Sequence, residues 1–220
     1  MTLGELLDGQ TVEKTLPLVN CPGCKKAKGS IKVKVTFTAR KALTLTKGSE
    51  LDTSSSKLAL AMGWDMLPGN QAVDVDASCV AFDDRGNVML DETVYFADLV
   101  NSNKTIRHSG DEQEGDEDLG CGDDEIIHID VERLNPRVKV LMLVATVATE
   151  GRTFKDVKTA RARVVNMETD EEFCRIYPGT SGDFTCLFVA RLVRVEGTKW
   201  RLNVIDDYDN VSRPRPTSDA

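Results

Sequence analysis

Carboxylates crowd into one short segment of this chain. Residues 110–125 read GDEQEGDEDLGCGDDE, in which nine of sixteen positions are Asp or Glu and none is Lys or Arg. Two further acids, Asp74 and Asp76, lie two residues apart in AVDVDASCVAF at 72–82, so an extended chain points both side chains the same way. Calcium and similar hard cations prefer such oxygen ligands. A metal-ligating loop and a solvated acidic loop are both compatible with the pattern, and both stay open here.

Gathering these acids without a cation would be unfavourable. Two unit charges about 4 Å apart repel by roughly 4 kcal/mol at an effective dielectric of about 20. A divalent cation removes that repulsion, and glycines at 110, 115, 120 and 122 suit the backbone angles of a folded ligand loop. The segment DVDAS at 74–78 is not an EF-hand, because it lacks that loop's third acidic position, its Gly and its closing Glu.

The acidity of the chain is local. The chain has 220 residues and a formal net charge of -8, and the nine acids of 110–125 more than account for that charge. Such a patch repels phosphates, so we expect no nucleic-acid partner and favour a cation or a basic protein. The N-terminus lacks a signal-peptide pattern, and no apolar run reaches the length of about 18 residues that spans a bilayer. We therefore expect a cytoplasmic protein with reduced thiols.

The cysteines offer little chemistry. CPGC at 21–24 has the spacing of half a zinc site or of a redox pair, but the sequence contains no second CxxC, which favours a turn with two incidental cysteines. Cys79, Cys174 and Cys186 fall on expected strands. We expect these three thiols to pack in or near the core.

Short strands separated by turns must position the acids. Alternating or continuous apolar segments predict strands at 29–41, 57–64, 72–82, 138–147 and 159–166, and hairpins around DDRGN at 83–87 and within 185–205. Helical signal is limited to a turn or two at 131–136 and 153–160, and 47–57 is expected to be a loop or a boundary region. Many short strands at this spacing indicate a β-sandwich or barrel.

An ordered series of motifs carries a family resemblance. The motifs are LTKG at 45–48, GWD at 63–65, VDVDAS at 73–78, HSGD at 108–111, GDDE at 122–125 and KWRLNVIDDY at 199–208. From about residue 43 to residue 208 the chain resembles the TerD family of tellurium-resistance and stress-response proteins. The resemblance implies an all-β fold, a two-sheet β-sandwich with long acidic loops at one end that bind calcium.

The resemblance implies a set of calcium ligands in this sequence. Three departures from the family pattern bear on the number and affinity of the sites: Ala97 stands in place of an Asn, the acidic loop is longer, and 146–154 lacks the usual His-Asp pair. The expected metal ligands, with Glu114 and Glu117 as additional acids of the long loop, are Asp74, Asp76, Asp98, Asp111, Glu114, Glu117, Asp123, Asp124 and Glu125.

The first residues resemble something else. Over a short stretch, residues 1–41 are similar to the C-terminal strands of a lipid-binding domain of the protein-kinase-C type. The resulting expectation is an N-terminal strand segment at 1–41, a TerD-like domain at 42–208 and a disordered tail at 209–220, where SRPRPTSDA is rich in proline and small polar residues.

These observations lead to ranked functional hypotheses. The first is a non-enzymatic calcium-binding stress-response or scaffold domain, whose acidic loops are ordered by calcium and present a surface to a protein partner. The alternative is a calcium-dependent peripheral membrane module that meets anionic lipid. A metal-dependent hydrolase ranks last, because the sequence shows no candidate base beside an open metal position.

Overall fold

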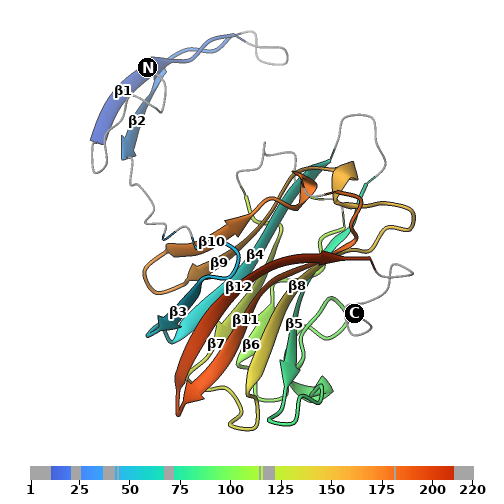
Figure 1. The fold of residues 1–220 in the computed structure, drawn as a ribbon. Helices are drawn as coiled ribbons and strands as arrows, with labels where there is room; N and C mark the ends of the chain where they lie inside the picture. Colours follow the sequence, from blue (N-terminus) through green and yellow to red (C-terminus); the bar gives the residue numbers. More distant parts are fainter. Residues whose placement is uncertain are drawn as a thin grey trace. The chain divides into compact units, whose positions relative to one another are not determined.

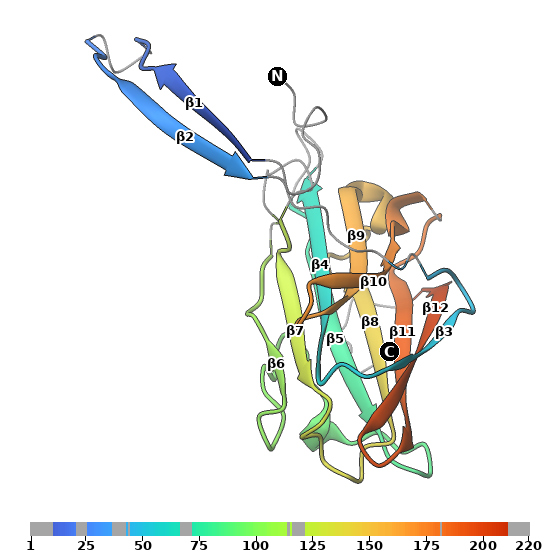
Figure 2. The ribbon, with the colours of Figure 1, turned by 90° about the vertical axis from the view of Figure 1, so that its left-hand side faces the viewer.

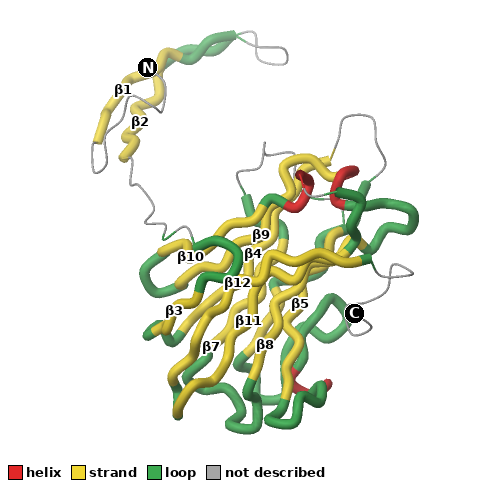
Figure 3. Tube along the Cα trace, in the orientation of Figure 1, coloured by secondary structure: helices red, strands yellow, loops and turns green. Residues whose placement is uncertain are grey.

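The computed structural model describes residues 11–20, 26–36, 43, 45–66, 72–113, 115, 122–180 and 182–210. The chain divides into two compact units, Met1–Lys41 and Ala42–Ala220. Strands make up most of the described secondary structure, and the helices drawn in Figure 3 are short 3-10 turns. The all-β class expected from the sequence is therefore confirmed. No described helix is long and apolar enough to cross a membrane.

The smaller unit is a β-hairpin. Strand β1 (Thr11–Pro17) pairs antiparallel with β2 (Ser30–Thr36). Cross-strand neighbours share a face of the hairpin, so Leu16 and Ile31 lie together on an apolar face. Both side chains are about half exposed, at 50% and 53%. The segment CPGC at 21–24 lies outside the described residues.

Two antiparallel sheets form the larger unit (Figures 1 and 2). In the described residues, the first sheet has the order β10-β9-β4-β7-β6 and the second β3-β12-β11-β8-β5. The first contains β4 (Lys57–Met66), β6 (Ile106–His108), β7 (Glu125–Asp130), β9 (Val157–Asn166) and β10 (Glu171–Ile176). The second contains β3 (Glu50–Thr53), β5 (Val75–Phe82), β8 (Val140–Val147), β11 (Cys186–Glu196) and β12 (Lys199–Asp209).

Alternation along the strands builds one core between these sheets. On β4, Leu58, Leu60 and Met62 are fully buried, and Trp64 is only 1% exposed. The Trp64 indole N–H donates to the carbonyl oxygen of Val73 at 3.1 Å, so this large side chain is buried without losing its hydrogen bond. The two-sheet β-sandwich expected from the sequence is confirmed.

The thiols of Cys79, Cys174 and Cys186 are buried as expected, with at most 1% of each residue exposed.

The outer edge of β5 is closed by groups that are not strands. Among the described strands, β5 pairs only with β8, along one side. On the other side, the Cys79 N–H donates to the Val94 carbonyl at 2.8 Å, and the Ala81 N–H donates to the Thr93 hydroxyl at 3.1 Å. An unpaired edge would invite association with another chain, and these contacts prevent that.

The turn at 83–87 forms, but the expected return strand does not. Asp83 N–H donates to the Asn87 carbonyl at 3.0 Å. The return segment then makes only isolated bridges, including Phe82 with Val88, and is interrupted by the 3-10 turn η2 (Leu90–Glu92).

Other segments also differ from the expectations. Residues 47–57 contain the short strand β3, and 131–136 forms turns without helix. In 153–160 the helical signal yields only η3 (Phe154–Asp156) before β9 begins. The expected tail contributes Asp209 to β12, while 211–220 lies outside the described residues. The described residues also contain the 3-10 turn η4 (Pro178–Thr180).

Candidate metal centre

Three of the predicted ligands come together at one end of the sandwich. Asp74 precedes β5, Asp76 lies within it, and Asp111 follows β6 on the opposite sheet. Each offers a carboxylate oxygen, and these oxygens all lie within 4.8 Å of one another. Asp76 is buried, Asp74 is half-buried and Asp111 is exposed, so the group opens toward solvent on the Asp111 side.

Backbone contacts fix the β5 half of this group. The Asp74 N–H donates to the hydroxyl of Thr149 at 2.8 Å, and its carbonyl accepts from the Ala148 N–H at 2.9 Å. Residues 148–149 follow β8, so the neighbouring strand holds Asp74 in place. The alternation of β5 then turns the Asp76 side chain to the same side as Asp74.

A buried carboxylate anchors the other half. Glu125, the first residue of β7, is fully buried. Its Oε2 accepts from the Ala77 N–H of β5 at 2.7 Å, and its Oε1 accepts from the Glu112 N–H at 3.2 Å. The second of these bonds fixes the main chain beside Asp111. Glu125 thus holds the loop carrying Asp111 against the strand carrying Asp76.

His108 completes the anchor. Its Nε2 lies 3.2 Å from Oε2 of Glu125, and both side chains are fully buried. Its Nδ1 accepts from the Gly110 N–H at 3.2 Å, which places the imidazole proton on Nε2, facing the carboxylate. Burial lowers the pKa of His108, but the contacts with Glu125 outweigh it and raise the pKa above the usual value.

Carboxylates of this group hold their protons unusually tightly. Burial, followed by the charges of Asp111 and Glu125, raises the pKa of Asp74 to about 6. Burial and the charges of Asp74 and Glu125 raise the pKa of Asp76 to about 8. Full ionisation of the group near neutral pH is therefore costly without a compensating positive charge.

The chemistry of the donor set fits a hard divalent cation. All three groups offer carboxylate oxygens, the ligands that calcium and magnesium prefer. One oxygen, Oδ1 of Asp74, is buried and has no hydrogen-bond partner in the part of the chain that the structure describes. A buried oxygen of this kind is normally satisfied by a donor, a water or an ion.

Asp123 and Asp124 serve other partners. Both Asp123 oxygens are held by the guanidinium group of Arg163, with a 3.0 Å bond from Nε, and Arg161 lies 3.8 Å away. Oδ2 of Asp124 accepts a hydrogen bond from the backbone N–H of Trp64 at 2.6 Å. Neither acid belongs to the carboxylate group described above.

The remaining predicted ligands are not placed in the group either. Asp98 is exposed, and its backbone bonds with that of Tyr95. The carboxylate group found among the described residues does not include it. Glu114 and Glu117 lie outside the described residues, as do the other residues of 116–121 in the acidic loop.

Two contributors were not predicted from the sequence. The charge of Glu112 adds to the electrostatic field at Asp74, and the Thr149 hydroxyl accepts a hydrogen bond from the Asp74 N–H. Glu112 could have been chosen because it adjoins Asp111 within the acidic segment. No signal marks Thr149, since its role depends on a contact with Asp74, which is distant in sequence.

Known proteins similar to this chain point to one family. The model of the TerD domain family matches residues 41–210. The chain is 30% identical over 173 residues to tellurium resistance protein TerZ of Serratia marcescens, covering 74% of this chain and 84% of that protein. It is 26% identical over 197 residues to stress response protein SCP2 of Bacillus subtilis (strain 168), covering 78% and 95%.

The chain also resembles a solved structure, that of a homologue of telluride resistance protein TerD from Streptomyces coelicolor A3(2). The two superpose with a TM-score of 0.62 over 72% of this chain and 92% of that one. At 17% identity this likeness establishes a shared fold.

Proposed function

Because this chain belongs to the TerD domain family, we propose that it is a calcium-binding stress-response protein without catalytic activity. Asp74, Asp76 and Asp111 would hold the ion, and Glu125 would position them. The bound ion would supply a fixed positive charge that orders the acidic loop, and the ordered loop end would then meet a protein partner in the cytoplasm.

The observation that carries this proposal is the convergence of the three carboxylates beside an unpartnered Asp74 oxygen. An acidic surface that served only solubility would gain nothing from burying Asp76. The raised pKa values of Asp74 and Asp76 express burial first and repulsion within the group second, and a divalent ion would offset both.

Binding would link two parts of the sandwich. Asp76 lies in β5 of one sheet and Asp74 directly before that strand, whereas Asp111 lies in the loop that leaves the other sheet. An ion shared between them would stabilise the arrangement in which the loop is closed, because a ligand that binds only the folded state raises its stability. Order in the loop and occupancy of the site would rise together.

The absence of catalysis is also part of the proposal. His108, the imidazole nearest the carboxylates, is fully buried and already pairs with Glu125. A general base must reach its substrate directly or through one water. The names of the relatives point to tellurium resistance and stress response, and we extend the stress-response role to this chain.

Calorimetric titration of chelator-stripped protein with calcium tests the proposal, with magnesium as the comparison ion. We expect saturable calcium binding that is tighter than magnesium binding. Asp76→Asn keeps the shape of the side chain and removes its charge, so it should abolish saturation. The matched control is Asp98→Asn, which removes an exposed acid outside the group. Equal binding by the wild type and Asp76→Asn would refute the site.

A second candidate rests on the hairpin. Its apolar face exposes Leu16, Ile31 and Val35, and exposed apolar patches mark contact surfaces. This favours the alternative in which the protein is a calcium-dependent peripheral membrane module. Sedimentation with anionic liposomes, in calcium and in chelator, separates the two functions: pelleting only in calcium would support membrane binding, and no pelleting in either would exclude it.

A further inference from the structure

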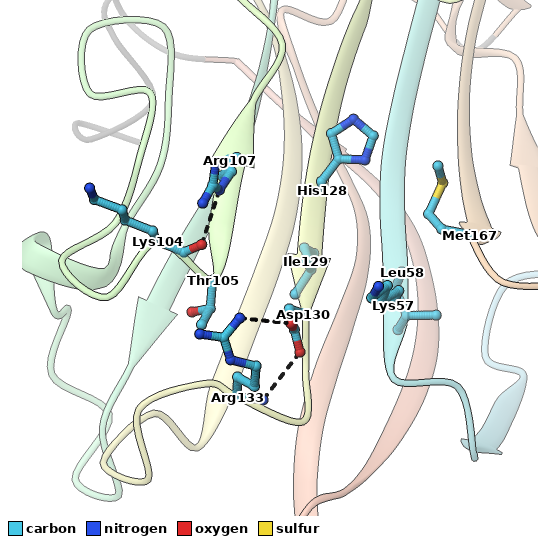
Figure 4. Close-up of a pocket in the computed structure, with 10 residues that line it drawn as sticks. All are labelled: Lys57, Leu58, Lys104, Thr105, Arg107, His128, Ile129, Asp130, Arg133 and Met167. Carbon is cyan, nitrogen blue, oxygen red and sulfur yellow. Dashed lines mark hydrogen bonds and ion pairs between the residues drawn. The ribbon is translucent and has the colours of Figure 1, made fainter.

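A cationic pocket lies on the outer face of the first sheet (Figure 4). It has a volume of about 390 Å³ and spans β4, β7 and β6. Lys104 and Arg107 border one side, His128 and Asp130 of β7 cross the middle, and Lys57 lies on the far side. Pockets that bind small ligands have volumes of roughly 300–1,000 Å³, so this one has the size for a compact ligand.

Positive charge dominates its lining. Four basic residues, Lys57, Lys104, Arg107 and Arg133, line the pocket, and a single acid, Asp130, accompanies them. Asp130 already accepts the Arg133 backbone N–H at 3.3 Å, and the Arg133 guanidinium group lies 3.7 Å from it. The other three basic side chains make no ion pair among the described residues, although the charge of Lys57 acts on the nearby acid Glu168, and the protein has a net charge of -8.

The orientation of Arg107 is fixed while its binding face stays available. Its Nε donates to the Lys104 carbonyl at 3.1 Å. Among the described residues, its terminal nitrogens make no hydrogen bond or ion pair, and neither do the ammonium groups of Lys57 and Lys104. A guanidinium group held by Nε presents its two terminal N–H₂ groups as a fork that suits a phosphate.

Several arginines elsewhere on the sandwich have acidic partners. Arg163 is paired with Asp123 and Glu172, Arg201 with Asp52, and Arg152 with Asp156. These arginines have acids beside them, whereas Arg107, Lys104 and Lys57 of the pocket make no ion pair among the described residues. Clustered cations with few acids repel one another, and a bound anion would relieve that repulsion.

We propose that this pocket binds a small phosphorylated compound. Arg107, Lys104 and Lys57 would contact the phosphate oxygens, because they come from two sides of the pocket and none of them makes an ion pair among the described residues. His128 would donate a neutral hydrogen bond, since burial lowers the pKa of its imidazole. The exposed Met167 side chain would contact the organic part of the ligand.

This site is separate from the metal centre. Lys57 pairs with Asp130 at one end of the β4–β7 ladder, and Met62 pairs with Glu125 at the other. At about 3.3 Å per residue, Asp130 and Glu125 lie roughly 16 Å apart along β7. The phosphate site therefore does not depend on whether the carboxylates bind calcium.

Inorganic pyrophosphate is a suitable probe, titrated into the full chain in chelator at constant ionic strength. Nuclear magnetic resonance should show saturable shifts of the His128 ring and of backbone amides in β6 and β7. Arg107→Gln should weaken binding about tenfold or more, since it removes charge-assisted hydrogen bonds. Arg107 is exposed, so this change should not disturb folding.

Arg191→Gln is the matched control, because Arg191 is an exposed strand arginine on the other sheet and outside the pocket. It should leave the affinity for pyrophosphate unchanged. Two results would overturn the proposal: no saturable shift at millimolar pyrophosphate, or equal weakening by both variants. Binding to phosphatidylserine vesicles without saturable pyrophosphate binding would also overturn it, by replacing a small ligand with a membrane surface.

Discussion

The backbone N–H of Ala77 on β5 donates to the carboxylate of Glu125 on β7 at 2.7 Å, which joins an edge strand of one sheet to a strand of the other. The same carboxylate accepts from the Glu112 N–H and pairs with His108. One buried side chain thus satisfies the Ala77 position on the free edge of β5 and holds the strand and the loop that carry the metal-centre aspartates together.

Glu125→Gln should therefore weaken the fold as well as the site. The amide that replaces one oxygen would face an N–H group, either of Ala77 or of Glu112, and would leave His108 without its negative partner. We expect the free energy of unfolding to fall by about 2–4 kcal/mol in urea titrations. Glu132→Gln, at an exposed position, is the control. Equal losses for the two variants would contradict the anchoring role.

The stability of the calcium-free protein should depend on pH in a defined direction. The pKa values of Asp74 and Asp76 rise from 3.8 to about 6 and about 8 on folding. Between pH 4 and 8, roughly, the folded state keeps protons that the unfolded state releases, so the free energy of unfolding falls as the pH rises. Urea titrations in chelator at about pH 5 and about pH 8.5 measure this loss.

Asp76→Asn isolates the contribution of the metal centre to this dependence. His108 also has a raised pKa, and its stabilisation is likewise lost as pH rises, so some dependence should remain. The variant should be less sensitive to pH than the wild type. Saturating calcium should have a similar effect on the wild type, because the ion favours the ionised carboxylates. A wild type whose stability rises steadily between these pH values would contradict the prediction.

Local pattern was enough to predict part of the site. Asp74 and Asp76 share a side because strand alternation has a period of two, which is visible in the sequence. The consecutive acids Asp123, Asp124 and Glu125 look equivalent in sequence, and the structure gives each a different partner. Asp123 pairs with the Arg163 guanidinium group, Asp124 with the Trp64 backbone N–H and Glu125 with the Ala77 backbone N–H. All three partners are distant along the chain. Their roles depend on tertiary contacts that no local pattern encodes.

The same limit applies to the fold. The long strand β11 and its partner β12 carry strong apolar alternation and were predicted. The four-residue strand β3 was not, because its sequence ELDT is largely polar. It becomes a strand by pairing with β12, where Leu51 lies opposite Leu202. Short edge strands depend on the neighbour they pair with more than on their own composition.

Asp123→Asn should destabilise the sandwich while sparing the metal centre. Asp123 neutralises Arg163 and lies near Arg161, whose side chains are only 9% and 5% exposed. Removing its charge leaves these cations undercompensated, and we expect a loss of about 3 kcal/mol in the free energy of unfolding. Calcium affinity in calorimetry should fall much less than in Asp76→Asn.

Asp183→Asn supplies the comparison for that loss. Asp183 pairs with Lys155 at 2.7 Å, but both side chains are largely exposed, at 74% and 51%. Exposed pairs of this kind contribute about 0–1 kcal/mol. If Asp123→Asn proved as mild as Asp183→Asn, burial of the Arg163 pair would not matter to stability. If instead it abolished calcium binding, Asp123 would belong to the metal centre.

Gly63 of β4 is predicted to tolerate no side chain. A Cβ atom there would lie 2.6 Å from Cζ of Arg161 and 2.7 Å from the carbonyl oxygen of Gly122. Gly63→Ala should therefore lower the free energy of unfolding by about 1–3 kcal/mol through overpacking. Gly179→Ala is the control, since its nearest atoms, carbonyl oxygens of Phe154 and Val157, lie 3.4 and 3.7 Å away.

A double-mutant cycle with Arg161→Gln identifies which neighbour causes the strain at Gly63. If the guanidinium group is the obstacle, the shorter and uncharged side chain should relieve it, and Gly63→Ala should be milder in that background. If the Gly122 carbonyl is the obstacle, the cost of Gly63→Ala should be the same in both backgrounds. Because Gly122 immediately precedes Asp123, the second result would mean that the β4 backbone itself sets the position of the segment leading into β7. Urea titrations of the four proteins measure the cycle, and a Gly63→Ala variant as stable as the wild type would remove the steric argument altogether.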